Sequence, residues 1–166
     1  MKKILLLLII CLGNTINVFS ATPIDEYSEN YCFLFEGKEH GAIASKTGSY
    51  CPVVGVFPRT HPHSWKWRNS LIEAYVTLKL SVTPFGTTKS IIVLDSYVRY
   101  LQTEKTSDGI KKEIIEKSPA SYFHRPAAKA AWKLKYKPLV LDDEGVETEN
   151  VIVRFFYYPR EINKLR

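Results

Sequence analysis

Signatures of catalysis and of cofactor binding are missing from this sequence. Its 166 residues contain no Gly-x-Ser-x-Gly elbow, no Walker loop, no His-Glu-x-x-His pair and no Gly-x-Gly-x-x-Gly turn. The four histidines are scattered, and none has an obvious serine or acid partner in the sequence. We therefore expect no enzymatic activity and no cofactor.

Cysteine is also scarce. Three cysteines are too few for a small protein stabilised mainly by disulfides, and the chain is long enough to bury a hydrophobic core without them. Cys11 lies in an N-terminal apolar run, which leaves Cys32 and Cys51. This pair predicts one disulfide in an oxidising compartment, closing a loop of about 20 residues and worth about 3 kcal/mol. Because no Cys-x-x-Cys spacing occurs, a structural bond is favoured over a redox pair.

A strong charge of one sign is absent as well. The formal net charge is +6, and removing residues 1–20 with Lys2 and Lys3 leaves 21 basic and 17 acidic residues, or +4. So mild an excess does not require nucleic acid as a partner. The chain is 45% apolar and 24% charged, which is typical of a globular protein and excludes a mainly disordered one.

The longest apolar run lies at the N-terminus. A basic start at residues 1–3 precedes nearly pure aliphatic residues 4–12 and a small-residue step at Ser20 and Ala21. This order predicts a secretory signal peptide over residues 1–20. The alternative is an uncleaved anchor over residues 4–24, although three polar residues in its middle argue against a membrane span.

Strict alternation gives the clearest structural pattern. Apolar residues at every second position predict a half-buried strand over residues 76–82. A Pro-Phe-Gly turn over residues 83–86 and a return strand over residues 90–94 complete an antiparallel hairpin. The last strand is expected over residues 151–158, and a shorter one over residues 31–35.

Helices are expected in two other segments. Alanines recur at spacings of three and four over residues 122–137, and the opposite face is basic, as on an ordinary solvated helix. Isoleucines at helical spacing predict a short amphipathic helix near residues 110–115. Before it, residues 97–101 either continue the hairpin strand or begin a loop.

Two patterns could hold a metal ion. His61 and His63 lie on the same side of an extended segment, but two ligands do not complete a site and no acid or cysteine lies near them. The acids of residues 142–144 are clustered rather than spaced alternately as in a calcium loop, and they precede Gly145 as a turn would. We therefore predict no metal site, with His61 and His63 as the remaining candidates.

The order of these elements resembles the C-terminal domain of TonB, the energy-transducing protein of Gram-negative envelopes. The matching stretches are Phe57-Pro58, residues 76–86, residues 91–96, a helix with Phe123, alanines 127, 128, 130 and 131, Tyr136 and Pro138, and finally Gly145 with residues 151–155. They cover about residues 57–159. The chain departs from the family in lacking a Pro-rich spacer and in carrying residues 97–121 as an insertion.

The resemblance implies an α+β fold with a three-stranded antiparallel sheet and helices on one face. We expect this TonB C-terminal-like domain over residues 57–159. A small disulfide-linked segment over residues 21–56 would precede it, and a tail over residues 160–166 would follow.

The resemblance also implies a binding site. In the family the last strand lies at a sheet edge and pairs with an extended segment of an outer-membrane receptor, which suits the unpaired backbone groups of an edge. The residues that match this edge strand are Val151, Val153, Arg154, Phe155 and Tyr157.

Three hypotheses about function follow. The first is a periplasmic or secreted TonB-like binding module that pairs with an outer-membrane receptor or another envelope protein. The second is a short energy transducer anchored in the inner membrane by residues 4–24 and coupled to a motor complex. The third is a small envelope enzyme or metal-binding protein that uses His61 and His63.

Overall fold

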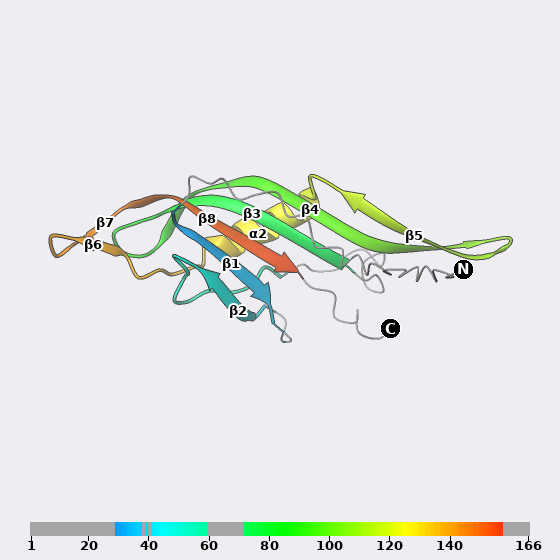
Figure 1. The fold of residues 1–166 in the computed structure, drawn as a ribbon, viewed down its shortest axis with the longest axis horizontal. Helices are drawn as coiled ribbons and strands as arrows, with labels where there is room; N and C mark the ends of the chain where they lie inside the picture. The colour runs from blue at the N-terminus through cyan, green and yellow to red at the C-terminus, as the bar shows by residue number, and fades with distance from the viewer. Residues whose placement is uncertain (1–28, 38, 40, 60–71, 158–166) are drawn as a thin grey trace, which may run out of the picture.

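The computed structural model describes residues 29–37, 39, 41–59 and 72–157. Along them follow β1 (Tyr31–Glu36), β2 (Ile43–Gly48), β3 (Ile72–Val82), β4 (Thr88–Thr106), β5 (Gly109–Lys117), the 3-10 turn η1 (Ser121–Phe123), α2 (His124–Ala131), β6 (Leu139–Leu141), β7 (Glu144–Val146) and β8 (Thr148–Tyr157), as labelled in Figure 1. The predicted signal peptide, the tail over residues 160–166 and both His61 and His63 lie outside the described residues.

The strands form a six-stranded mixed sheet in the order β2-β1-β8-β3-β4-β5, and β6 pairs with β7 in a separate two-stranded sheet. Neighbours in the large sheet are antiparallel except β1 and β8, which are parallel. The predicted three-stranded antiparallel sheet with helices on one face is therefore wrong. Strands β1 and β2 extend the sheet beyond β8, and β5 extends it beyond β4.

The hairpin predicted from alternation is confirmed. Strands β3 and β4 pair antiparallel, and the alternating apolar residues of β3 are buried. The turn between them is closed by the Gly86 amide, which donates to the Thr83 carbonyl at 2.9 Å. Gly86 has a φ of 74°, the left-handed conformation that glycine adopts at little cost.

The short helix predicted near residues 110–115 is wrong. Strand β4 continues to Thr106, and β5 returns along it from Gly109. Figure 1 shows this β4–β5 hairpin running far beyond the other strands. Two of its isoleucines, Ile110 and Ile114, lie four residues apart, a spacing that puts side chains on one face of a helix and equally on one face of a strand. Pairing of residues 109–117 with residues 98–106 of β4 selects the strand.

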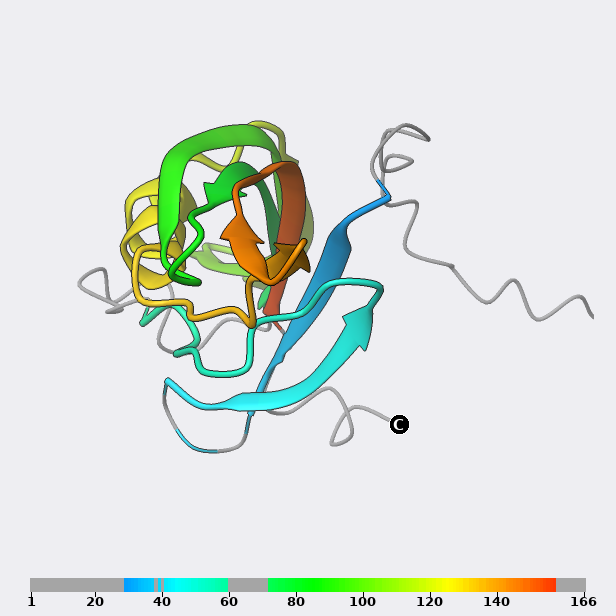
Figure 2. The same cartoon turned by 90° about the vertical axis from the view of Figure 1, so that its left-hand side faces the viewer.

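The helix predicted over residues 122–137 is shorter than expected. The 3-10 turn η1 opens the helical segment at Ser121, and α2 continues it to Ala131, where it ends. Beyond it the backbone turns away to bond with other segments. The Lys135 amide donates to the Val54 carbonyl at 2.7 Å, and the Tyr136 amide donates to the Gly86 carbonyl at 2.8 Å. Figure 2 shows α2 on one side of β3, β4 and β8, with β1 and β2 away from it.

The main core lies between α2 and the sheet. Alanines 127, 130 and 131 of α2 are buried and let the helix approach closely. Phe57 joins the core from the loop after β2, and its ring packs edge-on against Phe155 and Tyr157 at centroid distances of 5.6 and 5.0 Å. Large buried side chains on both the loop and the sheet stabilise this arrangement, because each removes apolar area from water.

The predicted disulfide is confirmed. Cys32 in β1 is bonded to Cys51 in the loop after β2, with their Cα atoms 4.9 Å apart. Such bonds persist in oxidising compartments, so the disulfide indicates a location outside the cytoplasm. None of the helices in the described ranges has both the length and the apolar character that crossing a membrane requires.

Candidate functional site

The last strand is not at an edge of the sheet. Strand β8 lies between β3 and β1, so that Val153 is opposite Leu78 on one side and Cys32 on the other. The predicted edge residues are all buried: Val151, Val153, Arg154, Phe155 and Tyr157. The edge position predicted for the binding strand is thus wrong, because a strand from the chain's own N-terminal segment already pairs there.

Strand β1 is built into the sheet rather than laid loosely beside it. Leu34 is fully buried in the core, and Phe35 stacks on Phe156 of β8 with centroids 5.2 Å apart. One pattern in the sequence pointed to this arrangement. From Val151 to Tyr157 both faces of β8 are apolar except at Arg154, and a strand that is apolar on both faces is usually central.

The Arg154 side chain makes contacts within the sheet, with residues of β3. Its Nε donates to the Thr77 hydroxyl at 2.7 Å, and its guanidinium lies over the Tyr75 ring at 4.6 Å from the centroid. Burial lowers the pKa of Arg154, and the negative charge of Asp95 acts in the opposite direction. Since the guanidinium is buried and bonded, Arg154 stabilises β8 against β3 and does not face a partner.

The structure brings together a serine and a histidine that sequence reasoning left apart. Ser96 Oγ and His124 Nε2 are hydrogen-bonded at 2.6 Å, and the Ala120 amide donates to the same Ser96 oxygen at 2.8 Å. A catalytic serine needs an accessible oxygen, but Ser96 is only 1% exposed. The pair therefore fixes the start of the helical segment to β4.

Replacing Ser96 with Ala should destabilise the fold by about 1–3 kcal/mol, because the buried Ala120 amide loses its acceptor. Urea unfolding followed by circular dichroism measures the change. The matched control is Ser121→Ala, which alters an exposed serine at the start of η1 and should have little effect. Equal unfolding midpoints for the two variants would contradict the structural role of Ser96.

Two strands of the large sheet have an open outer edge among the described residues: β2 and β5. Strand β2 has six residues, of which Ser45, Lys46 and Thr47 are exposed and polar. Lys46 also turns back, and its Nζ donates to the Pro52 carbonyl at 2.7 Å. A short polar edge of this kind is protected against pairing.

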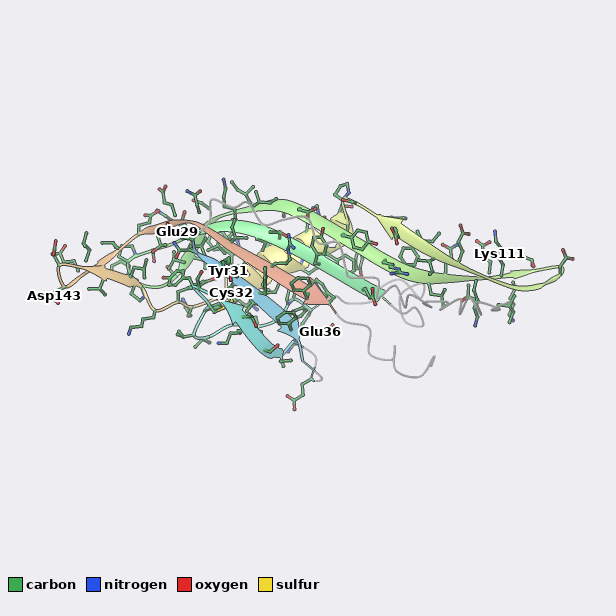
Figure 3. All side chains as sticks on the ribbon, in the orientation of Figure 1. Glu29, Tyr31, Cys32, Glu36, Lys111 and Asp143 are labelled. Carbon is green, nitrogen blue, oxygen red and sulfur yellow. A yellow bond between two sulfur atoms is a disulfide. The ribbon has the colours of Figure 1, made fainter. Side chains whose placement is uncertain are left out.

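Strand β5 offers a longer and more apolar edge. It has nine residues, and Ile110 and Ile114 are 65% and 54% exposed on the same face of the hairpin. Figure 3 shows Lys111 near the far end of this hairpin, at the opposite end of the molecule from Asp143. The lysines of β5 protect this edge in part, but Ile110 and Ile114 stay exposed beside them within the described ranges.

A second apolar surface lies at the opposite end. Phe85 in the β3–β4 turn is 88% exposed, and residues Leu139, Val140 and Leu141 of β6 are exposed beside that turn. The acidic residues 142–144 stand at the tip of the β6–β7 hairpin. This surface has no strand edge comparable in length to that of β5, so it is the weaker candidate for peptide pairing.

No cluster of three or more histidine, cysteine or acidic residues suited to a metal ion occurs where the structure describes the chain. The candidates His61 and His63 lie outside that part. Comparison with protein-family models, with curated proteins and with solved structures found no match to this chain. The resemblance to TonB C-terminal domains therefore stays a prediction from the sequence.

Proposed function

We propose that this protein is an exported binding module of TonB-like type that pairs with an extended segment of another envelope polypeptide. Pairing takes place at the outer edge of β5, not at β8. The disulfide between Cys32 and Cys51 supports a periplasmic or secreted location, and the sequence order of hairpin, helix, acidic turn and last strand supports the likeness to TonB.

The open edge of β5 carries the proposal. Backbone amides and carbonyls on its outer side face no other strand of the described chain, so an extended peptide can continue the ladder there. Each new backbone hydrogen bond adds about 0.5–1.5 kcal/mol net. Covering Ile110 and Ile114 adds about 1.5–3 kcal/mol for each side chain that becomes fully buried.

Pairing at β8 would require removal of β1, which is costly. Displacing β1 exposes Leu34 and Cys32, and it breaks the contacts of Phe35 with Phe156. The disulfide further holds β1 to the loop after β2, whose Val53 and Val54 amides both donate to the Lys135 carbonyl. These contacts hold β1 beside β8 in the folded protein.

Site-directed photocrosslinking in the cell envelope tests the proposal. A photoreactive amino acid in place of Glu113, which is exposed on β5, should give an adduct with another polypeptide chain. The matched control places the same group at Ser45 on the opposite edge strand, β2, where we expect no adduct.

Mass spectrometry of the adduct identifies the partner. An adduct at Glu113 with any folded envelope chain, including a second copy of this one, supports pairing at β5. The proposal fails if the probe at Ser45 is crosslinked and the probe at Glu113 is not.

A further inference from the structure

We infer that the strand paired with β5 belongs to a second copy of this chain, so that two β5 strands join antiparallel into one continuous sheet. The inference rests on the proposed function, because it uses the same edge and names the partner. The order of charged and apolar residues along β5, Gly-Ile-Lys-Lys-Glu-Ile-Ile-Glu-Lys, supports it.

Symmetry limits how two identical strands can pair. A twofold axis perpendicular to the sheet leaves each face of the sheet on its own side. Residues directly opposite each other must then share a face, so the axis passes through a residue and not between two residues. Three such registers keep most of β5 paired, and they are centred on Lys112, Glu113 or Ile114.

The register centred on Lys112 matches unlike charges and apolar side chains. Ile110 of each copy lies opposite Ile114 of the other, so that the exposed isoleucines of the two copies cover one another. On the other face of the hairpin, Lys111 of each copy lies opposite Glu113 of the other. Apolar pairs and opposite charges directly across two strands are the pairs that stabilise a sheet.

The Lys111 and Glu113 charges are already arranged for this pairing. Within one copy their side chains form an exposed ion pair at 3.8 Å. Pairing two copies in the Lys112 register places the four charges at the corners of a square, alternating in sign. An exposed ion pair contributes little by itself, whereas an alternating network contributes more.

The other two registers are less favourable. In the register centred on Glu113, the Glu113 carboxylates of the two copies lie opposite each other and repel. Lys112 then lies opposite Ile114. Centring on Ile114 places Lys111 opposite Lys117 twice. The Lys112 register has one like-charge pair, Lys112 with itself, and this central repulsion makes the association weak.

Sedimentation equilibrium of the purified protein, followed up to about 1 mM, tests the pairing, because small interfaces have dissociation constants on this scale. The wild-type chain should form dimers as concentration rises. Lys111→Glu and Glu113→Lys should each weaken the dimer roughly tenfold, since both cross-strand ion pairs become repulsive.

An equimolar mixture of these two variants supplies the internal control. In a mixed dimer each new charge lies opposite its complement, so association should return to the wild-type level. Any effect within a single chain, such as a changed contact of residue 111 with Glu104 on β4, persists in the mixture and cannot produce this rescue. Circular dichroism confirms that each variant is folded.

Lys112→Thr distinguishes the register centred on Lys112 from the one centred on Ile114. It removes the central repulsion and should tighten the dimer by roughly threefold, whereas in the Ile114 register it would remove an attraction to Glu116 and weaken the dimer. A protein that stays monomeric, with Lys112→Thr included, overturns the self-pairing. An adduct of the Glu113 photoprobe with a different envelope protein would in that case still support the proposed function.

Discussion

Replacing Val153 with proline should prevent the protein from folding. Val153 lies in the middle of β8 with neighbours on both sides, Cys32 in β1 and Leu78 in β3. Proline removes a ladder donor and cannot fit the centre of a sheet, and the fully buried valine side chain is lost from the core. We expect a loss on the order of 5 kcal/mol, which is comparable to the whole stability of many domains.

Thermal unfolding followed by far-ultraviolet circular dichroism measures this effect. The matched control is Glu113→Pro in β5, because Glu113 is exposed and the β4–β5 hairpin runs beyond the other strands of the sheet. That variant should lose pairing at the edge but keep the unfolding temperature of the core. A Val153→Pro protein that melts like the wild type would show that β8 is not a central strand.

Removal of the disulfide has the second largest expected effect. The double variant Cys32→Ala, Cys51→Ala should lose about 3 kcal/mol of stability, because the unfolded chain regains the freedom of a loop whose ends are 19 residues apart. For a domain of this size the melting temperature should fall by about 10 °C. Scanning calorimetry of the oxidised wild type and of the variant measures the difference.

Reductant separates this effect from the alanine substitutions themselves. It should lower the melting temperature of the wild type and leave that of the double variant unchanged. Hydrogen exchange should also become faster in β1, since Cys32 is its covalent link to the loop after β2. Identical melting temperatures with and without the bond would contradict its structural role.

Local patterns in the sequence were enough for several elements. Alternation over residues 76–82 predicted β3, and the Pro-Phe-Gly turn predicted its pairing with β4, because both features act over neighbouring residues. The pairing of Cys32 with Cys51 followed from the even count that remains after the N-terminal run.

Predictions that depended on distant neighbours were the ones that failed. The spacing of Ile110 and Ile114 suits one face of a helix and one face of a strand, and only the pairing with β4 selected the strand. Likewise the pattern of β8 was recognised as a strand, but its neighbours could not be read from its own residues. The contact of Ser96 with His124 joins a strand to a helix and has no signature in sequence spacing.

The amino-acid sequence by itself determined which segments carry the hairpin and the last strand and which two cysteines are bonded, because periodicity, turn residues and cysteine count are local properties. Only the tertiary structure decided the order of the strands. Pairing between strands depends on which backbone edges meet in space. Among the described residues β1 filled the side of β8, while the outer side of β5 was left open. That choice moves the proposed binding edge from the end of the chain to the β4–β5 hairpin.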